Sequence, residues 1–288
     1  MEKINKIIDV LESEGSLKDD DIELKRMNSG TTSGVLYTLL LDRNPAYVIK
    51  MDDPKIISST KDFLLAYKEI SVLPDVIYAD ENDNYIVYTY IPGKTHHNRG
   101  SKLEWMTILI RELFTKYNKI NNDTSWGRVN GIHRSTWSDF NNISFQLAHE
   151  SIGNYLPNED HRRIKELVEK LRGYHDKEEK YYLHGDTGIH NFVYNSNKLV
   201  GVIDPSPLIG PRIYDFTYAF CSSPDNMNIE TLLPLFALWK DNTPLTEERL
   251  IGEVIFQLYT RIGTCIKVHP QDLSSYTKVW SQWREYLS

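Results

Sequence analysis

The sequence contains little cysteine and no long apolar run. Cys221 and Cys265 are the two cysteines in 288 residues and form no CxxC pair, so neither a disulfide framework nor a cysteine zinc site is expected. No apolar run approaches the roughly 18 residues of a membrane-spanning helix. The opening "MEKINKIIDVLESEG" is charged throughout and lacks the apolar core of a signal peptide. We therefore expect a reduced cytoplasmic protein that has no membrane partner.

An excess of basic charge is also missing. The formal net charge is −7, because residues 1–93 hold 10 basic and 17 acidic residues while residues 94–288 hold 23 of each. A nucleic-acid partner recognised through a basic face is therefore not expected. The balance in residues 94–288 means that the charge of any ligand site there must be set by local side chains.

The two common nucleotide-binding fingerprints are absent as well, since the chain has neither G-x-x-x-x-G-K-[ST] nor the Rossmann glycine pattern. Short β-prone runs separated by turn residues fill residues 22–91, and apolar residues at helical spacing mark 2–15 and 59–73. Beyond "PGK" at 92–94 the pattern is mostly helical. We expect an α+β protein of two lobes, in which residues 1–93 form a five-stranded antiparallel sheet plus a helix and residues 94–288 form a mainly helical lobe.

The strongest pattern is "HGDTGIHN" at 184–191, which is followed by the apolar run "LVGVID" ending in Asp204. Asn191 stands five residues after Asp186. Phosphoryl transfer needs a carboxylate to accept the proton of the attacking hydroxyl and oxygen ligands for Mg²⁺. An Asp-x4-Asn loop followed by an aspartate at a strand end supplies both, as in the catalytic loop of protein kinases.

These residues resemble the aminoglycoside phosphotransferase and choline kinase superfamily, whose members share the bilobal protein-kinase-like fold and carry H-G-D. "PSPLIGPRIYDFTYAF" also resembles the segment that follows in that family. The resemblance is dense over about 181–220. It implies that Asp186 is the catalytic base, that Asn191 and Asp204 bind Mg²⁺, and that Asp215 and His184 hold the loop. Pro205, Ser206 and Pro211 depart from the family pattern and leave the loop shape beside the metal open.

The N-terminal residues agree with this resemblance. "YVIK" places Lys50 at the end of an apolar strand, as the phosphate-binding lysine is placed in kinases. "YIVYTYIPG" resembles the hinge between lobes, which implies that Thr89 C=O and Ile91 N–H face the base and that Tyr88 lines its pocket. The carboxylate partner of Lys50 is Asp62 or Glu69, and Asp62 is favoured because Glu69 lies close to Pro74. The loop expected to cover the nucleotide phosphates consists of small and hydroxylated residues, namely Ser29, Gly30, Thr31, Thr32 and Ser33.

The implied activity is transfer of a phosphoryl group from ATP or GTP, with Mg²⁺, to a hydroxyl of a small molecule. An aminoglycoside-type antibiotic is favoured, and a macrolide, choline, homoserine, methylthioribose or a sugar stays open. Acidic residues such as Glu150 and Glu253 are candidates to hold an amino sugar. A nucleotide-binding pseudokinase also stays open. A metallohydrolase that uses His184, Asp186 and His190 is disfavoured, because their spacing fits no common zinc pattern. The oligomeric state, monomer or dimer, is not fixed by the sequence.

Overall fold

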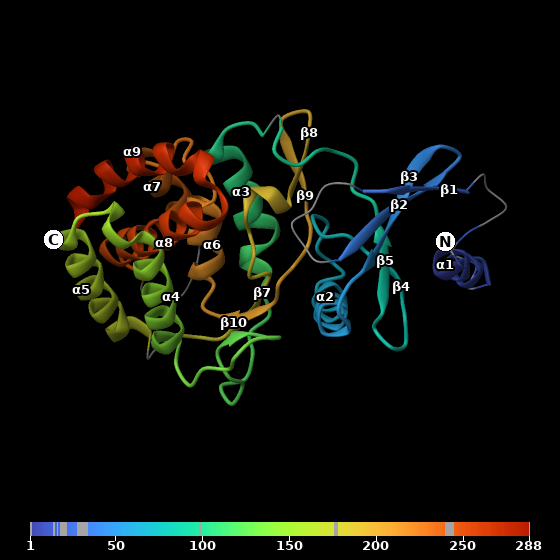
Figure 1. Ribbon diagram of the computed structural model, residues 1–288, viewed down its shortest axis with the longest axis horizontal. Helices are drawn as coiled ribbons and strands as arrows, with labels where there is room; N and C mark the ends of the chain where they lie inside the picture. The colour runs from blue at the N-terminus through green and yellow to red at the C-terminus, as the bar shows by residue number, and fades with distance from the viewer. Residues whose placement is uncertain are drawn as a thin grey trace.

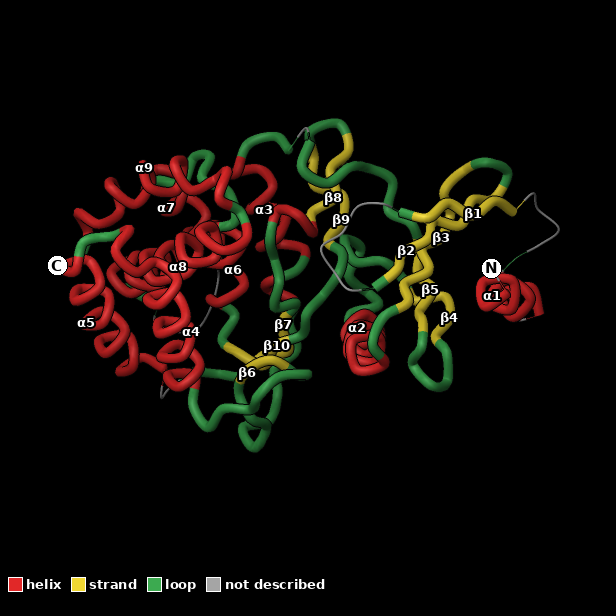
Figure 2. Tube along the Cα trace, viewed as in Figure 1, coloured by secondary structure: helices red, strands yellow, loops and turns green. Residues whose placement is uncertain are grey.

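The computed structural model describes residues 2–13, 15, 17, 22–27, 34–97, 99–175, 178–239 and 245–287. It is an α+β protein in which strands gather toward the N-terminal end of the molecule and helices fill the C-terminal end (Figures 1 and 2). The first part contains α1 (Glu2–Ser13), β1 (Ile22–Arg26), β2 (Val35–Leu41), β3 (Asn44–Met51), α2 (Pro54–Ala66), β4 (Val76–Ala79) and β5 (Tyr85–Thr89). Its strands form one antiparallel sheet in the order β1-β2-β3-β5-β4.

Alternation along the strands gives this sheet two buried faces. Ile49 and Val87 pack on the side of α1, whereas Val48 and Ile86 belong to the core that includes α2. The sheet accordingly lies between the two helices in Figure 1. Lys50 follows the parity of Val48, so its side chain points to the α2 face and the rest of the molecule.

Helix α2 differs from its expected span of 59–73. It begins at Pro54, whose missing N–H costs nothing at the first helical position, and the Asp53 side chain accepts a hydrogen bond from Lys55 N. It ends at Ala66, well before Pro74. "DDP" at 52–54 carried the start signal in the sequence, and the buried face of the helix is formed by Ile57, Thr60, Phe63 and Leu64.

The remaining elements form a helical body with two small sheets. They are α3 (Lys102–Glu112), β6 (Gly127–Arg128), α4 (Trp137–Ile152), α5 (Asn158–His175), β7 (Tyr181–Leu183), β8 (Phe192–Asn195), β9 (Lys198–Val202), β10 (Leu208–Gly210), α6 (Ile213–Cys221), α7 (Ile229–Leu238), α8 (Glu247–Val268) and α9 (Leu273–Trp283). The sheets are β6-β10-β7 and β8-β9. Helix α8 packs against α4, α5, α6 and α9. Among the helices of the described ranges, none is both long and apolar enough to cross a bilayer.

Direct hydrogen bonds dock α2 and the chain after it onto the helical body. Asn130 Nδ2 donates to Lys55 O at 2.7 Å, and the Tyr67 hydroxyl donates to Tyr182 O at 2.5 Å. Val202 N, at the end of β9, donates to Val72 O at 2.7 Å. These contacts hold the two parts together, and Lys50 of β3 pairs with Asp204 just beyond the end of β9.

Candidate active site

The loop 184–191 connects β7 to β8 and is anchored by its first residue. His184 is fully buried, and its Nε2 lies 3.1 Å from Ile203 O while its Nδ1 accepts from Asp186 N at 3.3 Å. Burial lowers the pKa of His184 to about 4, so the ring is neutral near pH 7. The acceptor role of Nδ1 places the proton on Nε2, which donates to Ile203 O. Both ring nitrogens are thus bound to backbone, and His184 braces the loop.

Asp215 of α6 holds the same loop from the other side. Gly185 N donates to both carboxylate oxygens, at 3.1 and 3.2 Å, and the Tyr117 hydroxyl donates to Oδ2 at 2.6 Å. Gly185 has φ +77°, and a Cβ there would lie 2.1 Å from Ser206 O, so only glycine fits. The structural role that the resemblance assigned to Asp215 matches this geometry.

The titration of Asp215 gives a testable pH dependence. Burial raises its pKa to about 6, against the effect of the bonds from Tyr117 and Gly185. Between about pH 4 and 6 the folded state then binds more protons than the unfolded state, so the contribution of Asp215 to the free energy of unfolding falls as pH rises. Asp215→Asn removes this titration. The stability of the variant relative to wild type is expected to rise by about 2 kcal/mol from pH 4 to pH 7.

Urea unfolding at both pH values measures this difference. The neutral buried His184 gives a slope of the opposite sign in the same range, but it is present in both proteins and cancels in the comparison. An equal stability difference at the two pH values would contradict the raised pKa of Asp215.

The carboxylate of Asp186 lies within the loop and is held ionised. Its Oδ2 accepts from Asn191 Nδ2 at 3.0 Å and lies 3.2 Å from His190 Nε2. Burial is the largest single influence and acts to raise its pKa, but His190, His184 and Tyr218 of α6 together outweigh burial and lower the pKa to about 2. His190 was considered from the sequence only as a metal ligand, although its spacing of four from Asp186 was visible.

Asn191 and Asp204 are brought together by the β8–β9 hairpin, in which Phe192 pairs with Val202 and Ile203 N donates to Asn191 O at 2.9 Å. The Asn191 amide nitrogen donates to Asp186, and no hydrogen bond to its Oδ1 occurs among the described residues. Asp204 has φ +56° and a third of its side chain exposed. One amide and one carboxylate oxygen fit Mg²⁺, which typically takes one or two protein carboxylates and completes its shell with phosphate and water.

Lys50 reaches this pair of residues across the interface between the lobes. Its side chain is 3% exposed and forms an ion pair with Asp204 Oδ1. The expected pairing with Asp62 is corrected, because Asp62 is exposed on α2 and Glu69 is exposed beyond the helix end. The buried stripe of α2 carries Thr60 instead, whose Oγ1 has no hydrogen-bond partner in the described structure. No carboxylate of the described part of α2 therefore takes the place that Asp62 was expected to fill.

The predicted base-binding residues lie at the end of β5. Thr89 is tied to the start of β4, because its N–H donates to Asp75 O and its Oγ1 accepts from Asp75 N, both at 2.9 Å. Ile91 is partly buried, and its N–H bonds to no described residue. Tyr88 is buried, and the charge of Asp204 adds to the burial that raises its pKa. Ser29, Gly30, Thr31, Thr32 and Ser33 lie outside the described residues. The nucleotide roles of these residues remain predictions.

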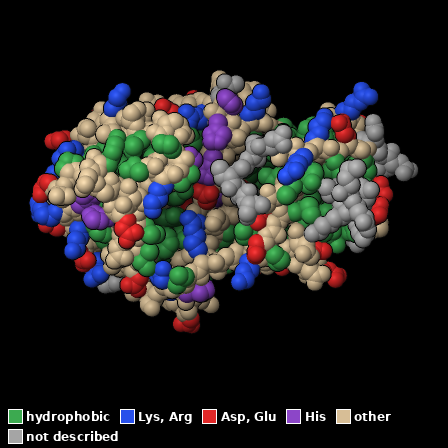
Figure 3. Space-filling model, in the orientation of Figure 1, with side chains coloured by type: hydrophobic (Ala, Val, Ile, Leu, Met, Phe, Trp, Pro, Cys, Tyr) green, Lys and Arg blue, Asp and Glu red, His purple; other side chains and the backbone are tan. Residues whose placement is uncertain are grey.

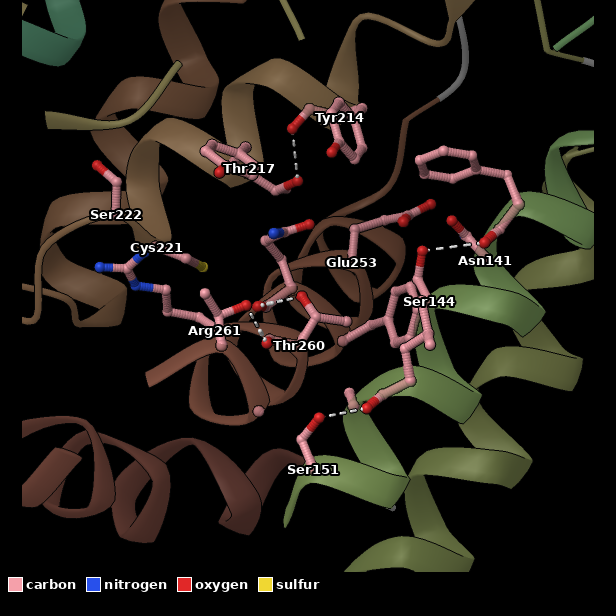
Figure 4. Close-up of a pocket in the computed structure, with 18 of the residues that line it drawn as sticks. Asn141, Ser144, Ser151, Tyr214, Thr217, Cys221, Ser222, Glu253, Thr260 and Arg261 are labelled. Atoms are coloured by element: carbon pink, nitrogen blue, oxygen red, sulfur yellow. Dashed lines mark hydrogen bonds between the residues drawn. The ribbon is translucent and has the colours of Figure 1, made fainter. Parts of the chain in front are cut away.

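A pocket of about 400 Å³ lies between α4, α6 and α8 and adjoins the loop 184–191 (Figure 4). Two of its lining residues contact the loop directly and a third lies close to it. Arg128 Nη1 donates to Gly185 O at 2.7 Å, Ser222 Oγ accepts from Ile189 N at 3.2 Å, and Tyr218 lies close enough to Asp186 to shift its pKa. Helix α8 approaches α4 closely at Gly263, where a Cβ would lie 2.9 Å from Ala148 Cα. The sequence did not reveal this pocket, because its walls come from distant segments.

Histidines collect at the outer side of the same loop. His96, His190 and His269 influence one another electrostatically, and Figure 3 shows histidine side chains gathered near the middle of the viewed face. Burial lowers the pKa of His96 and of His269, and the positive charge of neighbouring His and Arg side chains lowers both values further. Among the described residues no group of three His, Cys, Asp or Glu side chains has the geometry of a metal site, and the ring nitrogens of His184 are bound to backbone. The metallohydrolase hypothesis therefore loses its ligands.

The sheet, the helical body and the loop between them form a bilobal, protein-kinase-like fold. No family model and no curated protein matches the sequence. Among solved structures the chain is similar to a choline kinase from Cryptosporidium parvum Iowa II, with a TM-score of 0.63 and 12% identity over 98% of this chain and 95% of that one. It is also similar to choline kinase LicA from Streptococcus pneumoniae, with a TM-score of 0.60 and 13% identity over 99% of both chains.

An ADP-bound aminoglycoside phosphotransferase, APH(2'')-Ib, has the same arrangement, with a TM-score of 0.56 and 17% identity over 97% of this chain and 98% of that one. The predicted resemblance and the predicted bilobal α+β fold are confirmed by these likenesses. Identities of 12–17% establish the fold, and the activity must be argued from the site itself.

Proposed function

We propose that this protein is an NTP- and Mg²⁺-dependent O-phosphotransferase that acts on a hydroxyl of a small molecule. The observation that carries the proposal is the convergence of Asp186, Asn191, Asp204 and Lys50 beside a loop whose backbone contacts Arg128 and Ser222 of a pocket that suits a small acceptor. In this proposal residues 1–93 bind the nucleotide and residues 94–288 bind the acceptor. Its location in the cytoplasm stays a prediction from the sequence.

The chemistry follows from the roles of these side chains. The acceptor hydroxyl oxygen forms a bond to the γ-phosphorus, the bond from that phosphorus to the β,γ-bridging oxygen breaks, and Asp186 takes the hydroxyl proton. The pKa of Asp186, about 2, keeps it ionised but makes it a weak base. Proton transfer is therefore expected to come late, which suits the loose transition state of phosphoryl transfer.

Asn191 and Asp204 would hold Mg²⁺, which when bound supplies positive charge that neutralises the nucleotide phosphates. Lys50 lies where a phosphate oxygen can replace Asp204 as its partner, so the buried ion pair keeps the lysine positioned before nucleotide arrives. Asp186 and Tyr218 face the hydroxyl from the pocket side. Choline kinases and an ADP-bound aminoglycoside phosphotransferase among the similar structures support nucleotide as the donor.

The test is nucleoside-diphosphate release with Mg²⁺ and ATP or GTP, across hydroxylated metabolites, aminoglycosides and macrolides. Acceptor-dependent release that disappears in Asp186→Ala is the expected result. Nucleotide binding without nucleoside-diphosphate release for any acceptor of the panel would favour the pseudokinase alternative. Release that does not depend on nucleotide, or absence of nucleotide binding, would reject the proposal.

A further inference from the structure

The charged groups that line the pocket are mostly basic. Arg128, Arg261 and Lys267 face it, and Glu253 is its single carboxylate among the described residues. Glu253 is 7% exposed by side chain, and its Oε1 lies 3.4 Å from His175 Nε2 and 3.5 Å from Arg249 Nη2. Its negative charge is thus met by groups behind the pocket wall, and the cations dominate the space that a ligand would enter.

The guanidinium of Arg261 is positioned by the protein but not neutralised. Its Nε donates to the Tyr276 hydroxyl at 3.2 Å, and that hydroxyl donates to Cys221 O at 2.9 Å. Among the described residues no carboxylate lies within ion-pair distance of Arg261, Arg128 or Lys267, although fifteen other ion pairs occur. Arg128 donates to carbonyl oxygens and to a tyrosine hydroxyl. A fixed guanidinium without a counter-ion is suited to bidentate binding of a carboxylate or phosphate.

The rest of the lining is aromatic and hydroxylated. Trp137 and Phe140 stack with ring centroids 4.5 Å apart, and Tyr214 meets both edge-on. Figure 4 shows Ser144 and Ser151 on α4 facing Thr260 and Arg261 on α8 across the pocket. Such walls accommodate a ring with hydroxyls, while several ammonium groups would meet like charge at close range and lose hydration.

We propose that the acceptor is an anionic hydroxylated compound, a hydroxy-carboxylate or a phosphate ester with a ring, whose negative group is bound by Arg261 and Lys267 while its hydroxyl faces Asp186. This inference rests on the proposed phosphotransferase function and departs from the aminoglycoside-type acceptor favoured by the sequence resemblance. The charge of the pocket wall, rather than the chain as a whole, sets the preference.

The test uses three aryl sugars that share a ring and differ in charge, namely phenyl β-glucuronide, phenyl β-glucoside and phenyl β-glucosaminide, together with phenyl phosphate and an aminoglycoside. Binding by calorimetry and nucleoside-diphosphate release with Mg²⁺ and ATP or GTP are measured for each. The glucuronide is expected to bind about tenfold more tightly than the glucoside, and the two cationic compounds more weakly still. A comparison of the affinities for phenyl phosphate and phenyl β-glucuronide shows whether the pocket prefers a phosphate or a carboxylate.

Arg261→Gln is expected to reduce glucuronide affinity about 10- to 100-fold and to leave neutral-compound affinity within about twofold. Lys267→Met, at an exposed position, repeats the test without risk to the core. Arg111→Gln, an exposed arginine of α3 outside the pocket, is the matched control and should change neither value. Three results would overturn the inference. They are tighter binding of the cationic compounds than of the glucuronide, no binding of either anion to wild type, and the same glucuronide affinity in Arg261→Gln as in wild type. Anion binding that depends on Arg261 without any nucleotide binding would instead reject the phosphotransferase and retain the anionic pocket.

Discussion

Asp186→Asn is expected to lower kcat by about 10³-fold while the affinity for Mg-nucleotide changes by less than about threefold. A positioned general base contributes about 10²–10⁴ to a rate, and Asp186 also orients the hydroxyl. Asparagine keeps the size and the oxygen that accepts from Asn191 Nδ2 at 3.0 Å, so the loop should keep its shape. Single-turnover transfer and nucleotide calorimetry on the same samples separate the two quantities.

The pH dependence of wild-type activity is a second test of the role of Asp186. In wild type the pKa of Asp186, about 2, predicts no loss of activity from protonation of this carboxylate above about pH 4. His190 contributes most to that lowering, through its hydrogen bond and charge. A variant that lost nucleotide binding and turnover in parallel would contradict the role of Asp186, because it would mean that the carboxylate supports the nucleotide site.

The geometry of the loop 184–191 was predictable because it is local. Asp186, Asn191 and Asp204 lie within one hairpin and the turn before it, so a spacing along the chain becomes a spacing in space with little freedom. Gly185 is equally local, because the backbone of the loop has positive φ there. The contact of Asp215 with Gly185 N spans 30 residues, and the role of Asp215 was implied by the resemblance. Sequence patterns of this kind encode short-range geometry directly.

The partner of Lys50 was not predictable in this way. The contact joins residues 154 positions apart and depends on how the two lobes dock. The expected partner Asp62 also depended on which face of α2 docks against the protein. The buried face carries Thr60 and Phe63, and Asp62, about 200° round the helix from Thr60, faces solvent. The choice between Asp62 and Glu69 could not be made from the sequence without knowing which face of α2 is buried.

The charge of the pocket between α4, α6 and α8 was hidden by the neutral balance of residues 94–288. Many acidic residues of this part form ion pairs outside the pocket. Examples are Glu159 with Arg162, Glu248 with Lys170 and Glu178 with Arg249. The cations left unpaired at the pocket come from α8 and from β6, which the sequence separates by more than a hundred residues. Only the packing of α4, α6 and α8 brings them to one cavity.

Asp204→Asn is the variant with the second large expected effect, and it should affect stability and binding together. Asparagine tolerates the φ of +56° that alanine would strain, so the change removes charge and little else. Lys50, 3% exposed, then keeps a buried cation without its counter-ion. The free energy of unfolding should fall by about 2–3 kcal/mol, and Mg-nucleotide affinity should fall at least about 100-fold because a metal-binding carboxylate is lost.

The double variant Lys50→Met with Asp204→Asn separates these two effects. Removing the buried cation should restore most of the stability lost in Asp204→Asn, because no uncompensated charge remains in the interface between α2, β3 and the β9 end. Mg-nucleotide binding should stay lost, since neither the lysine nor the carboxylate is present. Urea unfolding and nucleotide calorimetry on wild type, both single variants and the double variant complete the cycle. Recovery of neither stability nor binding would indicate that Asp204 shapes the loop itself, whereas unchanged affinity in Asp204→Asn would remove it from the metal site and leave the ion pair with Lys50 as its whole role.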